Sequence, residues 1–142
     1  SLLMLDIDHF KRYNDEFGHL VGDATLREVA SVLRSSLRKV DIVGRYGGEE
    51  FIMVLPETGV QGAYDVAERI RSRIARHNFK VYDVSTRVTV SLGIAVFPED
   101  VPVEASASYD PEMLLEIIRR ADQALYRAKE EGRNRVIRFR DL

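Results

Sequence analysis

The sequence contains no cysteine, so disulfide bonds and sites built on thiolates are excluded. It has no apolar run close to the roughly eighteen residues that a membrane-spanning helix requires, and no charged stretch followed by an apolar leader. Basic residues are not in excess: 21 lysines and arginines stand against 23 acidic residues, and the formal net charge of −2 argues against a general nucleic-acid binder. We therefore expect a domain without membrane or nucleic-acid contacts, located in the cytoplasm.

Length and composition fit a single globular domain. The 142 residues suffice for one sizeable core, and hydrophobic and charged shares of 45% and 31% are ordinary for a soluble protein. No internal repeat, linker or low-complexity segment divides the chain. The expected elements follow the order βααββαββαβ, which predicts an α/β fold of the α+β sandwich type, with a central, mostly antiparallel sheet flanked by helices.

Apolar periodicity and turn residues give the expected boundaries of these elements. The expected helices cover 9–17, a segment that begins at Asp23 as its N-cap, a segment with inward apolar positions from Ala63 to Ile74, and a last segment from Asp110 to Gly132. The expected strands cover 2–5, the two apolar runs on either side of Gly47-Gly48, then 79–84, 88–97 and an edge strand at 135–139. Segments 18–22 and 98–109 are expected to be loops.

Gly47-Gly48 joins two strand-like runs and predicts a β-hairpin. A two-residue type I′ turn needs positive φ at both central positions, which glycine adopts without strain. Glu49 and Glu50 follow directly, although adjacent carboxylates repel each other and strands are poor in glutamate. A bound cation would relieve that repulsion. For this stretch alone, the alternative is a solvated hairpin tip with incidental acidic residues.

A second acidic group follows the first apolar run, where Leu5 leads into Asp6-Ile7-Asp8. Carboxylates at the end of a buried strand are well placed to bind a metal ion at the edge of a sheet. Hard oxygen ligands of this kind suit Mg²⁺ or Mn²⁺, which in nucleotide enzymes share their remaining positions with phosphates. The alternative is an acidic turn whose aspartates cap the next helix, an explanation that fits Asp8 better than Asp6.

Several motifs in a fixed order resemble one family. They are Asp6-Ile7-Asp8-His9-Phe10-Lys11, Asn14, Phe17-Gly18-His19, Gly22-Asp23, Arg45-Tyr46-Gly47-Gly48-Glu49-Glu50-Phe51, Ser91-Leu92-Gly93-Ile94-Ala95, the stretch from Ala121 to Lys129, and Gly132-Arg133-Asn134. Together they resemble the GGDEF domain of the diguanylate cyclases, which join two GTP molecules into cyclic di-GMP. The resemblance runs from Leu5 to Asn134, and so covers nearly the whole chain.

The resemblance implies a fold like the catalytic palm of nucleotide cyclases and polymerases, in which two metal ions serve nucleotidyl transfer. By this resemblance the ions, Mg²⁺ or Mn²⁺, are held by Asp6, the carbonyl of Ile7, Glu49 and Glu50. Glu49 is the expected acceptor of the proton of the attacking 3′-hydroxyl, and Glu50 is a second ligand or supports the first. The Lys11 side chain is expected to stabilise charge during the transfer.

The same resemblance implies how the GTP triphosphate is bound. Phe10 and Lys11 begin the first helix, where free backbone N–H groups can bind phosphate oxygens. Lys129 and Arg133 are the expected cations for the β- and γ-phosphates. Their alternative explanation is a favourable position for cations at the C-terminus of a helix.

Guanine recognition is expected at Asn14 and Asp23, and His19 between them is expected to complete the pocket. A carboxylate accepts from the guanine N1–H and N2–H₂ groups, whereas adenine offers no such pair of donors. Asp23 therefore favours GTP over ATP.

Arg38 and Asp41, placed just before the hairpin, match the product-inhibition motif of the family, an Arg-x-x-Asp sequence. Arg69 resembles the secondary arginine that reaches the same cyclic di-GMP from another subunit. By itself the motif is a weak signal, because such a pair is usually a surface ion pair of little value. We expect this site to be displaced from Asp6 and Glu49.

We expect residues 1–142 to be one GGDEF catalytic domain without the segment resembling Asp-x-Leu-Thr-Gly-Leu-x-Asn-Arg-Arg that usually precedes the first strand, and without an upstream sensory or dimerisation region. Because each domain offers one GTP site, turnover requires a second GGDEF domain. The rival hypothesis is a receptor that binds cyclic di-GMP or GTP without catalysis. Degenerate family members lose the hairpin carboxylates, and this sequence keeps Glu49 as well as Asp6, which favours the enzyme.

Overall fold

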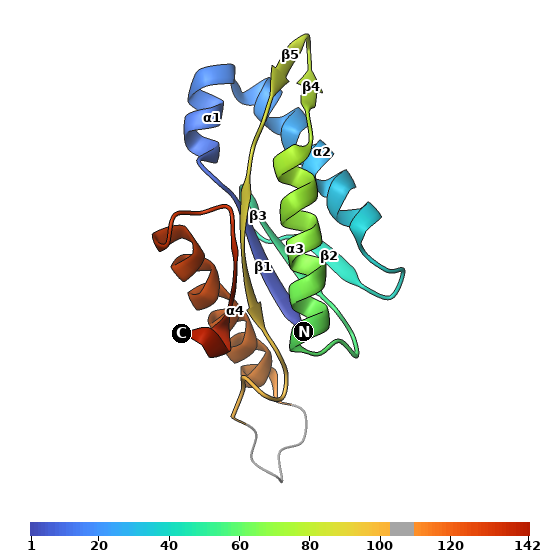
Figure 1. The fold of residues 1–142 in the computed structure, drawn as a ribbon, viewed down its shortest axis with the longest axis vertical. Coiled ribbons are helices and arrows are strands. Elements are labelled where there is room, and N and C mark those ends of the chain that lie inside the picture. Colours follow the sequence, from blue (N-terminus) through green and yellow to red (C-terminus); the bar gives the residue numbers. More distant parts are fainter. Residues whose placement is uncertain (103–109) are drawn as a thin grey trace.

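The computed structural model describes residues 1–102 and 110–142. Its strands are β1 (Leu2–Ile7), β2 (Ile42–Arg45), β3 (Glu50–Val54), β4 (Phe79–Val81), β5 (Val84–Thr86), β6 (Val90–Ala95) and β7 (Val136–Arg138). Its helices are α1 (Phe10–Phe17), α2 (His19–Ser36), α3 (Val60–Arg76), α4 (Pro111–Glu130) and the 3₁₀ turn η1 (Phe139–Asp141). The five-stranded sheet has the order β2-β3-β1-β6-β7, and β4 and β5 form a separate ribbon beside α1 (Figure 1).

Strand β1 is the centre of the sheet, and every one of its residues is buried. It pairs antiparallel with β3 on one side, where Leu5 lies opposite Phe51, and with β6 on the other, where Leu5 lies opposite Leu92. Within the sheet only β7, which places Val136 opposite Leu92, runs parallel to its neighbour. The predicted α+β fold with a mostly antiparallel sheet is therefore confirmed.

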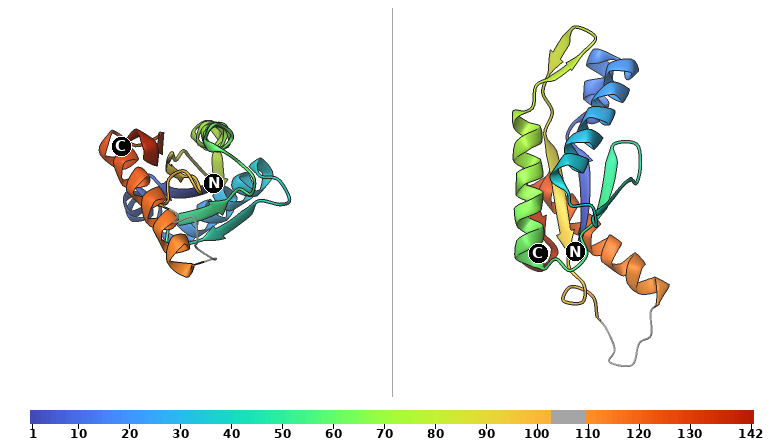
Figure 2. Two further views of the ribbon diagram at one scale, coloured as in Figure 1. Left: turned by 90° about the horizontal axis from the view of Figure 1, so that it is seen from below. Right: turned by 90° about the vertical axis from the view of Figure 1, so that its right-hand side faces the viewer.

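Each face of the sheet has its own core. Side chains of a strand alternate between faces, and in β1 Leu3 and Leu5 pack with residues of α2 and α3, whereas Leu2 and Met4 pack against α4. Figure 2 shows α3 and α4 on opposite sides of the sheet. Helix α4 lies so close to β6 that a Cβ atom on Gly93 would be 2.1 Å from the carbonyl oxygen of Ala121.

The start of α2 differs from the prediction. The expected loop over 18–22 is mostly helical, because α2 begins at His19 and the Gly22 N–H donates to the Gly18 carbonyl at 3.0 Å. The chain turns at Gly18 alone, whose φ of 87° is the left-handed conformation that glycine tolerates. Asp23 consequently lies inside the helix, and its predicted role as N-cap is wrong.

Two further turn predictions need correction. The expected strand over 79–84 is not continuous: it contains β4, a turn and the first residue of β5. Tyr82 and Asp83 (φ 47° and 65°) form the two-residue turn between the two strands. The hairpin at Gly47-Gly48 is present, but neither glycine has positive φ, so the type I′ prediction is wrong. Instead β2 and β3 are joined through residues 46–49, and the N–H groups of Tyr46 and Gly47 both donate to the Glu50 carbonyl.

The remaining boundaries agree closely with expectation. Asp110 caps α4, its carboxylate accepting from the Glu112 N–H at 2.9 Å, and Pro111 is the first helical residue. Strand β6 is shorter than the expected 88–97, and β7 is an edge strand as predicted. Of the expected loop over 98–109, residues 103–109 lie outside the described part. Within residues 1–102 and 110–142, no helix is long and apolar enough to span a membrane.

Candidate active site

The acidic residues predicted from two separate stretches meet at one end of the sheet. Asp6, near the end of β1, lies opposite Glu50, the first residue of β3, and the Ile7 N–H donates to the Glu49 carbonyl at 3.2 Å. Antiparallel pairing brings the two acidic stretches together, since β1 ends where β3 begins. Asp6 and Glu49 therefore lie at the ends of two neighbouring strands.

Asp6 is almost fully buried, with 5% of its surface exposed. Burial raises its pKa from the usual 3.8 to about 6; the Lys129 ammonium lowers the pKa, and the charges of Glu49 and Glu50 raise it further. Lys129 donates a hydrogen bond to Asp6 Oδ2. Thus the end of α4 already supplies one positive charge to this group of carboxylates.

These residues fit a divalent cation by their chemistry. The donors are all hard oxygens, and a cation would offset both the burial of Asp6 and its repulsion with Glu49 and Glu50. As the side chains stand, no three acidic, histidine or cysteine residues in the described ranges are gathered closely enough to hold a metal ion. A divalent cation held by these carboxylates would therefore need side-chain movement.

The raised pKa of Asp6 leads to a prediction about stability. The raised pKa means that the folded state binds this proton more tightly than the unfolded chain does. Ionisation of Asp6 therefore lowers the free energy of unfolding as the pH rises from about 4 to about 6, and the loss persists at higher pH. Asp6→Asn should raise the free energy of unfolding at pH 7.5 by about 1–2 kcal/mol. One pKa unit corresponds to about 1.4 kcal/mol, and the full value is reduced here because the site is partly solvated. The gain should vanish near pH 4. Urea unfolding with a chelator present measures both values, and Asp15→Asn is the exposed control.

The phosphate-binding candidates lie at the start of α1, which follows β1, and at and after the end of α4. Helix α1 begins at Phe10, after His9, which has a left-handed φ of 55° and provides no side-chain cap. The first N–H groups of α1 are therefore not satisfied by a cap. Lys11 is exposed on α1, and Arg133 follows α4 with a φ of 63°.

Asp8 does not cap α1, so that alternative reading is wrong. Its carboxylate accepts from the hydroxyls of Thr89 and Ser91, both at 2.7 Å, and from the Asn134 N–H at 3.0 Å. These three donors come from β6, from the segment before it and from the turn after α4. A local sequence pattern does not identify any of these segments as a neighbour of Asp8.

The guanine-binding candidates gather where α1 meets α2. Asn14 Oδ1 is buried, and the described residues offer it no hydrogen-bond partner. A Cβ atom on Gly22 would lie 1.8 Å from that oxygen, so a larger residue there would displace the Asn14 side chain. His19 and Asp23 are exposed on the first two turns of α2. A buried acceptor without a partner is unusual in a folded protein.

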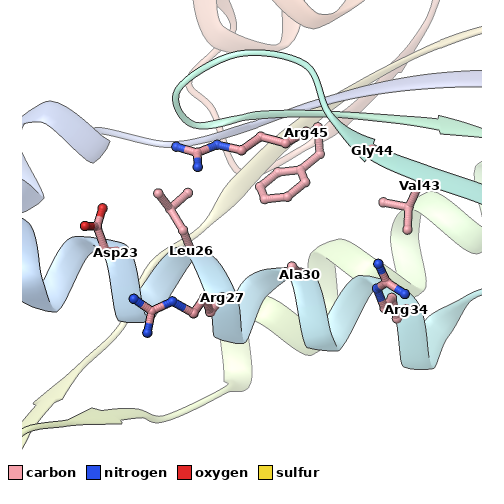
Figure 3. Close-up of a pocket in the computed structure, with 9 residues that line it drawn as sticks. Asp23, Leu26, Arg27, Ala30, Arg34, Val43, Gly44 and Arg45 are labelled. Carbon is pink, nitrogen blue, oxygen red and sulfur yellow. The ribbon is translucent and has the colours of Figure 1, made fainter.

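Asp23 also lines a cavity of about 440 Å³ between α2 and the β2–β3 hairpin. The lining residues are Asp23, Leu26, Arg27, Ala30, Arg34, Val43, Gly44, Arg45 and Phe51 (Figure 3). Its three arginines were not predicted as site residues. Asp23, Arg27 and Arg34 share one face of α2, and their helical spacing can be recognised in the sequence. That this face lies opposite β2 depends on the tertiary fold and cannot be recognised from local sequence. The Arg45 Nε atom donates to the carbonyls of Gly47 and Gly48 at 3.1 and 3.0 Å, which holds the hairpin loop.

Arg38 and Asp41 lie at the other end of the hairpin. They precede β2, whose four residues, roughly 13 Å of extended chain, separate them from the loop that carries Glu49. Arg38 Nη2 donates to Asp41 Oδ1 at 2.8 Å, to the Pro56 carbonyl and to Thr58 Oγ1. These bonds hold the pKa of Asp41 below its usual value. The expected separation from the carboxylates is present.

Arg69 is engaged within its own chain. Its Nη2 atom donates to the carbonyl of Ser36, the last residue of α2, at 2.7 Å. The carbonyls at the end of a helix lack partners inside the helix, and a guanidinium satisfies one well. Arg69 therefore stabilises the end of α2 directly before the Arg38–Asp41 turn.

An α+β sandwich with a mixed, mostly antiparallel sheet and carboxylates at the hairpin end of its two central strands defines a palm-like nucleotide cyclase domain. Within this class, the chain belongs to the GGDEF family: the family model described as "Diguanylate cyclase, GGDEF domain" matches residues 1–135.

Curated relatives agree with this assignment. The chain is 43% identical over 136 residues to diguanylate cyclase A of Treponema denticola, 44% over 135 residues to diguanylate cyclase DgcP of Pseudomonas aeruginosa, and 42% over 139 residues to the response regulator PleD of Caulobacter vibrioides. These alignments cover 96%, 95% and 96% of the chain but only 34%, 18% and 28% of the relatives. The chain thus spans about a third or less of their lengths.

Solved structures show the same fold. The active GGEEF domain of a diguanylate cyclase from Vibrio cholerae aligns with a TM-score of 0.79 at 37% identity, over 97% of this chain and 81% of that one. The GGDEF domain of DgcB from Caulobacter crescentus, in complex with c-di-GMP, aligns with a TM-score of 0.81 at 35% identity, over 98% and 77%.

Proposed function

We propose that this chain is the catalytic domain of a diguanylate cyclase, which condenses two GTP molecules into cyclic di-GMP and two pyrophosphates. The observation that carries the proposal is the meeting of Asp6, Glu49 and Glu50 at the ends of β1 and β3. The curated cyclases that match nearly the whole chain support the same activity.

Asp6, the Ile7 carbonyl, Glu49 and Glu50 are the residues that would hold Mg²⁺ or Mn²⁺, two ions per site. Bound metal would neutralise the triphosphate and acidify the 3′-hydroxyl of the attacking nucleotide. Lys129 moves from Asp6 to the phosphates when GTP and metal bind, so the positive charge beside Asp6 is replaced rather than lost.

The protein positions the reactants and moves one proton. The backbone N–H groups of Phe10 and Lys11, with the side chains of Lys11, Lys129 and Arg133, bind the triphosphate. The proton of the 3′-hydroxyl goes to Glu49 while the 3′-oxygen forms a bond to the α-phosphorus of the other GTP. The bond between that phosphorus and the oxygen bridging to the β-phosphate breaks, and pyrophosphate leaves. Two such transfers, between two facing domains, close the ring.

Guanine is held by Asn14, Asp23 and His19. The unpartnered Asn14 Oδ1 supports this, because the guanine N1–H and N2–H₂ groups are donors.

The test of the activity is product formation by the full-length protein. With GTP and Mg²⁺ we expect cyclic di-GMP and pyrophosphate, identified by chromatography and mass spectrometry. The second candidate is a receptor that binds cyclic di-GMP or GTP without catalysis, and a neighbour solved in complex with c-di-GMP supports it. Tight binding of cyclic di-GMP without turnover in any metal would replace the enzyme assignment with the receptor.

We further propose that Arg38 and Asp41 bind cyclic di-GMP as a feedback inhibitor, with Arg69 of a second domain. Arg69 has to release the Ser36 carbonyl to reach that ligand. Two domains joined in this way cannot bring their GTP sites face to face.

Arg38→Ala should weaken cyclic di-GMP binding by about 10- to 100-fold, the effect of losing a hydrogen bond to a charged group. Calorimetric titration measures this, and the initial rate at low product concentration should remain as in the wild type. Lys39→Ala removes a neighbouring exposed cation and is the matched control. Equal affinities for the wild type and Arg38→Ala would reduce the motif to a surface ion pair.

A further inference from the structure

Asp8 is a buried carboxylate that the proposed reaction does not use. Only 7% of its surface is exposed, and the described residues include no cation paired with it. Three donors converge on it instead: the hydroxyls of Thr89 and Ser91 and the Asn134 N–H. Burying a charge without a partner cation is costly, and the three hydrogen bonds offset that cost.

The Asn134 bond joins two segments that are 126 residues apart in sequence. Asp8 directly precedes the first turn of α1, and its own N–H donates to the Thr89 carbonyl at 2.9 Å. Asn134 directly follows Arg133, in the turn after α4. One side chain therefore connects the start of α1, which offers free N–H groups, to the turn that carries the Arg133 guanidinium.

The turn after α4 needs such a connection because its backbone is strained. Arg133 and Asn134 have left-handed φ values of 63° and 47°, which residues other than glycine rarely adopt. Strained residues persist only where surrounding contacts hold them. Here the contacts are the Arg133 N–H to the Ala128 carbonyl at 3.0 Å, Arg71 Nη1 to Asn134 Oδ1 at 3.0 Å, and the Asp8 bond.

We propose that Asp8 is a positioning residue for the triphosphate of GTP: its carboxylate fixes the Arg133 turn relative to the start of α1. This inference rests on the proposed function, because it assigns the phosphates to these two segments. A carboxylate suits the position better than an amide, since all three partners approach as donors and a carboxylate is acceptor-only. An amide places an NH₂ group against at least one of them unless a hydroxyl turns to accept.

A residue that merely stabilises the fold would affect all ligands alike, whereas a residue that positions phosphate-binding groups would affect the triphosphate alone. The measured quantity is therefore the ratio of two dissociation constants, for GMP and for a non-hydrolysable GTP analogue, with Mg²⁺ and the full-length protein. GMP carries the same base without the β- and γ-phosphates. Cyclic di-GMP, titrated at Arg38 and Asp41, serves as a binding control at the far end of the hairpin.

Asp8→Ala should weaken binding of the GTP analogue about tenfold or more, while the affinities for GMP and cyclic di-GMP change less than about twofold. Asp8→Asn should lie between the wild type and Asp8→Ala, because its carbonyl oxygen can still accept from the Asn134 N–H. Thr89→Val is the matched control: it removes one donor to Asp8 and leaves the Asn134 bond, so the ratio should remain close to that of the wild type.

Equal loss of GMP and analogue affinity in Asp8→Ala, or no loss of either, would overturn the inference. If Asp8→Ala does not fold, Asp8→Ser, which also removes the oxygen that accepts from the Asn134 N–H, decides in its place by the same two outcomes. If the wild-type protein binds the GTP analogue but forms no product, the proposed cyclase activity is wrong, yet the ratio of dissociation constants can still be measured. The two failures are therefore distinguishable.

Discussion

Glu49→Gln is expected to lower the rate of cyclic di-GMP formation by about 10²- to 10⁴-fold, the usual contribution of a positioned general base, with further loss where a metal ligand is removed. The amide has the shape of the carboxylate but neither its charge nor its basicity. Initial rates with saturating GTP and Mg²⁺ in an active full-length protein measure the effect.

The fold should not change, because the structural contact of Glu49 belongs to its backbone. Its carbonyl accepts from the Ile7 N–H, and no other described residue forms a hydrogen bond or ion pair with its side chain. The free energy of unfolding should therefore stay within about 0.5 kcal/mol of the wild type. Glu57→Gln, an exposed glutamate at the opposite end of the hairpin, is the control. Near-normal turnover by Glu49→Gln would remove Glu49 from both of its proposed roles.

Opposite effects on stability and activity are expected at Asp6. Asp6→Asn should stabilise the fold at neutral pH, because burial disfavours the charged carboxylate and Glu49 and Glu50 repel it as well. The same substitution should impair catalysis. A buried charge that lowers the stability of its own fold is typical of functional residues, which natural proteins retain at a cost in stability.

The sequence predicted the carboxylates of the site because each follows a local pattern. Leu5 continues into Asp6, and Gly47-Gly48 precedes Glu49, so each acid is tied to the end of a strand. Which strands become neighbours is a long-range property. The register that places Asp6 opposite Glu50 was not predicted and is known from the structure alone.

The wrong predictions concern single residues in the left-handed region. Gly18 alone turns the chain between α1 and α2, and Tyr82 with Asp83 forms a tight turn inside an apparently continuous strand. Glycine pairs are the usual signal for such turns, yet Gly47 and Gly48 are not in that conformation here. Backbone conformation at these positions depends on the strands on either side and on contacts such as those of Arg45, which local composition does not encode.

Several lysine and arginine side chains were predicted to bind ligands, but in the structure two of them already have partners within the chain. Lys129 bonds to Asp6, which is 123 residues away, and Arg69 bonds to the Ser36 carbonyl. Contacts at such sequence separation leave no local pattern. For both residues, the proposed ligand binding requires an exchange of one partner for another.

The base preference should depend on Asp23, and the corrected position of this residue strengthens the argument. As an N-cap, Asp23 would have given one carboxylate oxygen to the backbone of α2. Instead it lies in the second turn, exposed on the cavity side, and no hydrogen bond or ion pair within the described residues involves its carboxylate. Both oxygens are therefore available to the N1–H and N2–H₂ groups of guanine.

We expect the wild-type enzyme to prefer GTP over ATP by roughly 10⁴-fold in kcat/KM, as sites built to hydrogen-bond one substrate do when the competitor leaves their polar groups unpaired. Asp23→Ser should reduce that preference by about two orders of magnitude, chiefly by weakening the use of GTP, because serine cannot accept from both donors at once. Competition between GTP and ATP, with both products quantified by mass spectrometry, gives the ratio directly. Asp122→Ser, an exposed aspartate within α4, is the matched control and should keep the wild-type ratio. Comparable use of ATP and GTP by the wild type, or an unchanged ratio in Asp23→Ser, would place guanine recognition elsewhere, with Asn14 and its unpartnered oxygen as the next residue to test.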